Sequence, residues 1–199
     1  MEKISKDELT KILDGLALQT IWISMCIDEL DALQEIGNDR IKIAKNFFYI
    51  THSSLIYRYS MEIAKLFDDG DVLSIYRIRN ICLKHKEYFS VDITEYCKKF
   101  KDELKKYNET IINIQNRRNK TYAHNDKEYY LFKKRAIQDN PLDYEAIKKL
   151  ADLLYYFAKT MQEKINSCRK EQGYPANTDD VKRLFRLKTK DDLWLEETD

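Results

Sequence analysis

Arg118 and His124 lie six positions apart in one polar segment, RNKTYAHND (residues 118–126), of a chain with only three histidines. A guanidinium group can hold a phosphate in a bidentate fork. An imidazole can move a proton near neutral pH, because its unperturbed pKa is about 6.5. These two groups are together a minimal set for cleaving RNA without a metal, so we treat the segment as a candidate catalytic motif.

Arg118 occupies the last position of an apolar seam whose members are spaced alternately by four and three residues. The earlier members are Ile93, Cys97, Phe100, Leu104, Tyr107, Ile111 and Ile114. Because a buried unpaired charge is expensive, we expect a carboxylate partner, a wet cleft or a polar subunit interface around Arg118. Arg117 lies about 100° away around the helix, and we expect it to face solvent.

His124 does not share a face with Arg118 on a straight α-helix. Six residues rotate a side chain by about 600°, which leaves the two side chains about 120° apart. Three solutions are open: the helix could unwind near Thr121, the long stem of the arginine could bridge the gap, or two chains could each supply part of one site.

The other polar and aromatic candidates have ordinary structural interpretations. We interpret Tyr122 as a packing residue and Lys120 as part of a solvated face that could also touch an RNA phosphate. His52 is interpreted as a core residue, and His85 as part of a basic helix end. The segment 129–135 mixes aromatic rings with cations, a combination that can bind single strands, although a packed loop is the simpler interpretation.

The overall charge gives no sign of a dedicated nucleic-acid surface. Lysine and arginine total 35 against 34 acidic residues, so the net charge is +1 and anion binding requires a local patch. The four cysteines form no cluster, and the acidic segment 68–71 lacks the ligand spacing of a calcium loop. We therefore expect no metal and no cofactor. No apolar run approaches the roughly 20 residues of a membrane span, and we expect a cytoplasmic protein without membrane contact.

Helical periodicity runs through almost the whole chain, which contains only 4 glycines and 2 prolines. Apolar stripes predict helices over about 9–30, 41–66, 74–86, 93–118 and 147–165, with a polar loop between the last two. We therefore predict an all-α fold, an antiparallel bundle of four to five helices over residues 1–172, with a short charged C-terminal extension over 173–199.

The motif residues, on the fourth predicted helix, resemble the signature of the HEPN superfamily, an arginine followed within a few residues by a histidine. The segment from Phe47 to Asp69, followed by Leu73-Ser74-Ile75, resembles the abortive-infection branch, close to the AbiU-type HEPN proteins. The resemblance covers roughly residues 5–168.

The resemblance implies a helical bundle that dimerises across the motif helix and acts as a metal-independent endoribonuclease. Arg118 and His124 would be catalytic, with Asn119 supporting them, while Asp126 matches the acidic position of this branch. Arg117, Lys120 and Tyr122 are candidate supporting or substrate-binding residues. In this chemistry the 2′-OH attacks the adjacent phosphorus, the histidine serves as general base or acid, and the arginine stabilises the added negative charge.

We accordingly expect a homodimer that cleaves RNA in phage defence or in toxin-like growth arrest. An antitoxin or a nucleotidyltransferase is a further candidate partner. The alternative is a helical HEPN module that does not cleave and instead binds a protein partner or nucleic acid. A metal-dependent helical phosphohydrolase is disfavoured, since no HD pair and no Glu-x-x-His pair occurs.

Overall fold

The computed structural model describes residues 4–36, 41–42, 44–122, 127, 131 and 133–165. Within this part of the chain the structure is all-α and has no strand, which confirms the predicted fold class. The helices are α1 (Lys6–Gln34), α3 (Lys45–Leu66), α4 (Ile75–Lys84), α5 (Thr94–Leu104), α6 (Asn108–Arg117), α8 (Lys133–Asp139) and α9 (Tyr144–Ile165). Two 3₁₀ turns, η1 (Lys86–Tyr88) and η2 (Lys105–Tyr107), and one π-helical turn, η3 (Arg118–Tyr122), link them.

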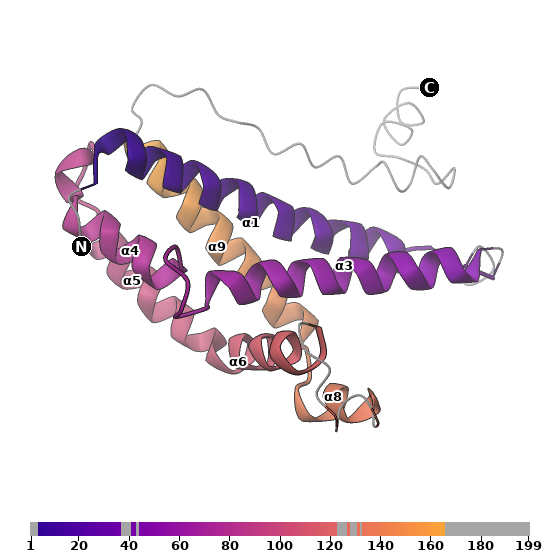
Figure 1. Cartoon of the computed structure of the whole chain (residues 1–199). Coiled ribbons are helices and arrows are strands. Elements are labelled where there is room, and N and C mark those ends of the chain that lie inside the picture. The colour runs from indigo at the N-terminus through magenta and orange to yellow at the C-terminus, as the bar shows by residue number, and fades with distance from the viewer. Residues whose placement is uncertain are drawn as a thin grey trace, which may run out of the picture.

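The long helices alternate in direction and form a bundle (Figure 1). α1 packs along both α3 and α9, and α5 packs against α9. The connection between α4 and α5 closes one end of the bundle. Ser90 donates from its backbone nitrogen and its hydroxyl to the Lys164 carbonyl, at 2.8 Å and 3.0 Å. The Tyr88 hydroxyl donates to the Ile4 carbonyl at 3.1 Å, so the ends of α9 and α1 meet at this connection.

The core follows directly from the apolar stripes. Apolar side chains at spacings of three and four residues lie on one face of each helix, and these faces meet in one continuous cluster. The predicted stripe of α9 is fully confirmed, since Ile147, Leu150, Leu154, Phe157, Met161 and Ile165 are all buried. Phe157 is at the centre, with its ring centroid 3.9 Å from that of Phe100 and 6.1 Å from that of Tyr96.

The predicted fourth helix is not one straight rod. The 3₁₀ turn η2 separates α5 from α6, and the two helices meet at a bend in Figure 1. Tyr107, the seam residue within this turn, is only half-buried, whereas its neighbours Leu104 and Ile111 are buried. The apolar spacing is therefore kept through the bend, which is why the sequence pattern did not reveal it.

Three further details differ from the sequence-based expectations. The predicted loop after the motif contains the short helix α8. His52 is exposed on α3 instead of buried in the core. His85 ends α4 as expected, but it is buried and its ring stacks on Tyr88 at 5.3 Å.

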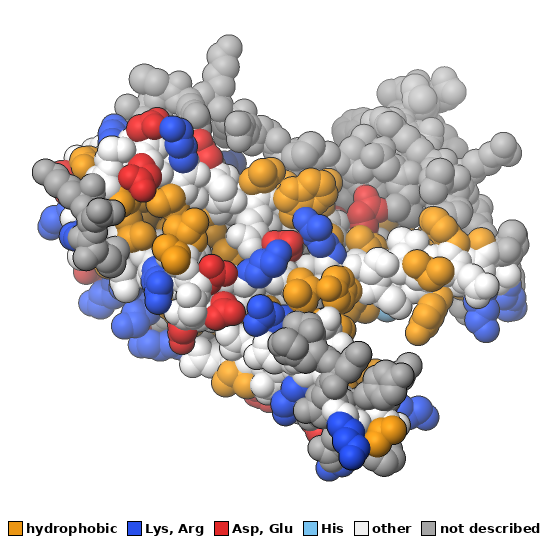
Figure 2. Space-filling view, viewed as in Figure 1, with side chains coloured by type: hydrophobic (Ala, Val, Ile, Leu, Met, Phe, Trp, Pro, Cys, Tyr) orange, Lys and Arg blue, Asp and Glu red, His pale blue; other side chains and the backbone are white. Residues whose placement is uncertain are grey.

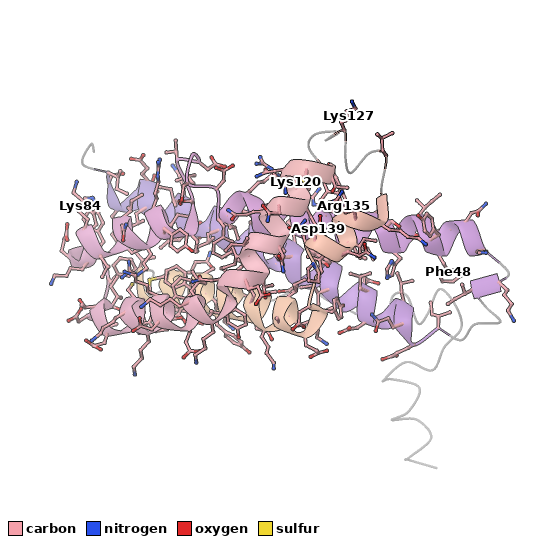
Figure 3. The ribbon with its side chains drawn as sticks, turned by 90° about the horizontal axis from the view of Figure 1, so that it is seen from below. Phe48, Lys84, Lys120, Lys127, Arg135 and Asp139 are labelled. Atoms are coloured by element: carbon pink, nitrogen blue, oxygen red, sulfur yellow. The ribbon has the colours of Figure 1, made fainter. Side chains whose placement is uncertain are left out.

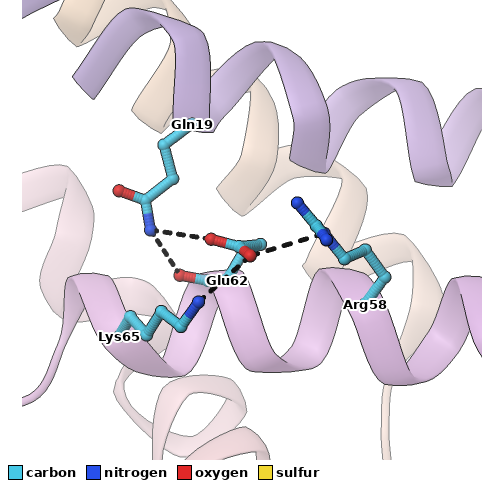
Figure 4. Close-up of polar contacts among 4 residues, drawn as sticks. All are labelled: Gln19, Arg58, Glu62 and Lys65. Carbon is cyan, nitrogen blue, oxygen red and sulfur yellow. Dashed lines mark hydrogen bonds and ion pairs between the residues drawn. The ribbon is translucent and has the colours of Figure 1, made fainter. Parts of the chain in front are cut away.

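A polar contact fixes the pairing of α1 with α3 (Figure 4). Gln19 on α1 donates to the backbone carbonyl and to a carboxylate oxygen of Glu62 on α3, both at 3.2 Å. The same carboxylate accepts from Lys65 at 3.2 Å and lies 3.4 Å from Arg58 Nε. Because Gln19 binds both the main chain and the side chain of one residue, this contact specifies the register of the two helices.

Three cysteines lie in the described residues, and Cys26, Cys82 and Cys97 are all buried free thiols. Burial raises the pKa of the Cys82 thiol to about 12, with a smaller contribution from Cys97. Cys168 lies outside the described residues. None of the described helices combines the length and the apolarity that crossing a bilayer requires.

Replacing Phe157 with alanine should lower the free energy of unfolding by about 3–5 kcal/mol, because a cavity would form against Phe100. Urea denaturation followed by circular dichroism at a fixed protein concentration measures this change. Tyr156→Ala is the matched control, since this neighbouring ring is exposed and its loss should change stability by less than about 0.5 kcal/mol. Equal losses for the two variants would contradict the assigned core.

Candidate functional site at the arginine turn

The candidate site begins where α6 changes its winding. α6 ends at Arg117, and the next five residues form the π-helical turn η3. Hydrogen bonds in a π-helix join residues five apart, so each residue turns through less than the 100° of an α-helix. Of the three solutions considered for the Arg118–His124 pair, unwinding near Thr121 is therefore present in the described part of the motif.

Arg118 lies at the junction of the seam and this turn, with about a third of its side chain exposed, at 31%. Its Nη1 donates to Asn119 Oδ1 at 2.9 Å and to Asp68 Oδ2 at 3.4 Å. Its Nε is buried and has no hydrogen-bond acceptor within the described residues. Of the three environments expected for this charge, the structure supplies the carboxylate partner.

The carboxylate of Asp68 is held in a fixed position at the end of α3. Its Oδ1 accepts from the Gly70 backbone nitrogen at 3.0 Å, which leaves Oδ2 for Arg118. A Cβ added at Gly70 would lie 3.2 Å from Asp68 Oδ1, so glycine leaves room for this tight turn. Gln115 on α6 donates to the Phe67 carbonyl at 2.8 Å and fastens the end of α3 to the helix that carries Arg118.

Arg117 has a different role from its neighbour. It does not face solvent as expected, but is half-buried and donates from Nε to the Asn140 carbonyl at 2.7 Å. Asn113 on the same helix donates to the Pro141 carbonyl at 3.0 Å. Together these bonds hold the connection between α8 and α9 against α6, which identifies Arg117 as a structural residue and separates it from Arg118.

Two tyrosines of α3 pack close to the far end of η3. The Tyr57 and Tyr122 rings meet edge to face with their centroids 5.3 Å apart, and Tyr57 remains 45% exposed. Tyr59 is almost fully buried. Burial raises the pKa of Tyr59 to about 12, and Tyr122 adds to the increase while Arg117 opposes it. The packing expected for Tyr122 is therefore observed, and it brings η3 against α3.

Cationic side chains are present on the same side of the molecule. Figure 3 shows Lys120 of η3, Arg135 of α8 and Lys127 on the side that these two elements occupy. Arg135 lies 3.7 Å from Asp139 of its own helix, so part of this charge is compensated locally. With Arg118, these residues are candidates for the local cationic patch that a chain of net charge +1 needs for binding an anion.

The described structure contains one half of the proposed residue pair. Arg118, Asn119, Lys120 and Tyr122 all lie on η3, whereas His124 and Asp126 lie outside the described residues. Sequence reasoning missed Asp68 and Tyr57 as neighbours of the motif, because both are at least 50 residues away from it along the chain. Asp68 belongs to the acidic segment 68–71, whose spacing disfavours a calcium loop. In the described part of the chain, no three acidic, histidine or cysteine side chains are close enough to hold a metal ion.

A comparison with protein families now identifies the class. Residues 6–184 match a model of the HEPN type. The family is described as AbiU2, and since the match spans most of the chain, the protein belongs to this family, HEPN_AbiU2. No curated protein and no solved structure matches the chain. The domain boundary predicted at residue 172 lies outside the described residues and stays a prediction.

The buried hydroxyl of Tyr59 predicts a loss of stability in alkali. A tyrosine whose pKa is raised from 10 to about 12 stays protonated in the folded state while it ionises in the unfolded state, so stability falls as pH rises between these values. Relative to Tyr59→Phe, the wild-type protein should lose on the order of 2 kcal/mol over this range. Urea denaturation at several pH values measures it, with Tyr49→Phe on the exposed face of α3 as the control. Parallel pH profiles for wild type and Tyr59→Phe would contradict this assignment.

Proposed function

We propose that this protein is a metal-independent endoribonuclease that cleaves RNA by attack of a 2′-OH on the adjacent phosphorus. The observation that carries the proposal is the partly exposed side chain of Arg118 on the π-helical turn of a HEPN_AbiU2 family member. π-helical turns inside α-helices frequently coincide with functional sites. A role in phage defence or in growth arrest of the toxin type follows from the same family membership.

Arg118 would bind the non-bridging oxygens of the scissile phosphate. Its charge matches the negative charge that grows on these oxygens in the transition state, and removal of one such donor typically costs about 10²–10³ in rate. The neighbouring Asn119 amide fixes one guanidinium nitrogen at 2.9 Å, which limits the rotation of the group. Lys120, Lys127 and Tyr122 are candidates for contacts to the flanking nucleotides, and Asp126 is a candidate partner of His124.

His124 would move the protons. As general base it would take the proton of the 2′-OH, and as general acid it would give one to the 5′ oxygen that leaves. The bond from phosphorus to the 2′ oxygen forms while the bond to the 5′ oxygen breaks. The products are a 2′,3′-cyclic phosphate and a 5′-hydroxyl, and no metal takes part.

Arg118→Ala and His124→Ala should each reduce cleavage of a single-stranded RNA in EDTA by at least about 10²-fold, while the circular dichroism spectrum stays that of the wild type. Arg118→Lys should also be impaired, because an ammonium group does not offer a planar fork. The same oligonucleotide with 2′-deoxyribose at the cleavage position should not be cut.

Arg58→Ala is the matched control for loss of an arginine. Arg58 is half-exposed on α3 and pairs with Glu62 (Figure 4), and its guanidinium lies over the Trp22 ring of α1, so its removal should leave cleavage unchanged. Cleavage that persists in both Arg118→Ala and His124→Ala would overturn the assignment. Absence of cleavage by the wild-type protein under all conditions would favour the non-catalytic binding module instead.

We further propose that the active form is a homodimer in which two copies of the motif helix line one site. Exposed apolar side chains on α3, one of which contacts η3, support this proposal. One face of α3 carries the exposed side chains of Phe47, Ile50 and Tyr57 at helical spacing. Ile137 of α8 and Leu131, two positions before this helix, are exposed as well. Figure 2 shows hydrophobic side chains at the surface along α3. An antitoxin or a nucleotidyltransferase could cover the same surface as a partner.

Mixing the two inactive variants tests the shared site. In a dimer whose site takes its arginine from one chain and its histidine from the other, a mixed dimer of Arg118→Ala and His124→Ala contains one intact site. Co-expression with two different tags should therefore recover about one quarter of wild-type activity, given statistical pairing of the chains, and more after purification of the mixed species. Mixed dimers that remain inactive would show that each site, if active, uses both groups of one chain.

A further inference from the structure

The hydrogen-bonding state of Arg118 is unusual for a group that is to hold a phosphate. A guanidinium carries five N–H donors, and a bidentate phosphate needs two of them on neighbouring nitrogens. Here Nη1 already donates to Asn119 and faces Asp68, while Nε is buried. Neither edge of the guanidinium therefore offers two available donors to an incoming phosphate.

We propose that the Arg118 guanidinium is the cationic half of an anion site that the Asp68 carboxylate occupies in the free protein and that an RNA phosphate takes over on binding. The inference rests on the proposed function for the identity of the ligand. Its basis is a contact across 50 residues of sequence between two side chains that are each about one third exposed, at 31% and 36%.

The contact is strong enough to place the guanidinium and weak enough to be replaced. Its length of 3.4 Å is at the long end for a charge-assisted hydrogen bond. Water reaches both partners, so solvent and salt screen their attraction. A phosphodiester brings two unprotonated oxygens that fit the fork in the same plane, and it can therefore compete with a single carboxylate oxygen.

The Asp68 carboxylate is also held in place independently of Arg118. Its Oδ1 is anchored to the Gly70 nitrogen, so the carboxylate cannot follow the guanidinium toward a ligand. Loss of the contact returns one Nη1 donor and completes the edge formed by Nη1 and Nη2. A buried Nε without an acceptor is itself unfavourable. The ligand therefore does not have to break a hydrogen bond to Nε when it displaces Asp68.

The site can be tested by binding alone, with the full chain and a fluorescein-labelled single-stranded 2′-O-methyl RNA that cannot be cleaved. Asp68→Asn removes the charge but keeps an oxygen acceptor for the Gly70 nitrogen, so the turn should persist. We expect this variant to bind the oligonucleotide about threefold to fivefold more tightly than the wild type, as the loss of a half-exposed competing charge implies. Fluorescence anisotropy at fixed salt measures the dissociation constants.

Asp69→Asn is the matched control, because it makes the same change in net charge one position away and the Asp69 backbone carbonyl that binds Arg77 is unaffected. It should change the dissociation constant by less than about twofold, since a side chain without a contact to Arg118 acts only through the screened field. In an Arg118→Ala background the effect of Asp68→Asn should disappear, because the carboxylate then has no guanidinium to occupy.

The measured dissociation constants test this inference independently of whether the protein cleaves RNA. Tighter binding that requires both Asp68→Asn and an intact Arg118 supports the site, even if the wild-type protein cleaves no RNA and the proposed function fails. Equal effects of Asp68→Asn and Asp69→Asn, weaker binding of Asp68→Asn, or an unchanged effect in the Arg118→Ala background would overturn it. Lack of binding by both the wild type and Asp68→Asn would overturn it as well.

Discussion

A guanidinium group at the end of an apolar seam needs an opposite charge nearby, and the contact between Arg118 and Asp68 meets this need. The seam residues Ile111 and Ile114 are buried, and the next position of the seam places the cation of Arg118 at the edge of the core. Without a counter-charge, the helix would either shift this position into solvent or lose the local packing. The position of the charge therefore depends on the end of another helix.

The end of α3 is held in place from both sides. Within the bundle, Glu62 is bound by Gln19 of α1, which sets where α3 lies along its neighbour. One turn further, the Phe67 carbonyl accepts from Gln115 of α6. Asp68 follows directly, and its own carboxylate is fixed by Gly70. The position of Asp68 thus depends on polar contacts that begin in the middle of the bundle. Through Gln19, α1 helps to position α3 and therefore the site, although α1 itself makes no contact with Arg118 in these bonds.

The sequence predicted the features that depend on local periodicity. Apolar spacing specified the stripes of α1 and α9, and the seam from Ile93 to Arg118 keeps its buried face through the bend. Spacing could not reveal the 3₁₀ turn η2, because the buried residues on either side of it keep the same spacing. It could not reveal the π turn η3, because that turn begins only where the apolar seam ends. It could not reveal Asp68 or the Asn140 carbonyl as arginine partners either, since such contacts arise only when distant segments pack. His85 was misjudged because two flanking lysines suggested a surface, whereas the ring of Tyr88 covers it.

The π turn also has a consequence for how the motif relates to the rest of the chain. A turn closed by five-residue hydrogen bonds contains more residues than the α-helical turn it replaces. The direction of the chain at Tyr122, the last described residue of this turn, therefore depends on the number of residues in η3. Four residues at 100° each turn the chain through about the same angle as five residues in this wider turn, so an α-helical replacement of η3 would keep the direction only with one residue fewer. In this helix the number of residues is as much a functional property as their identity.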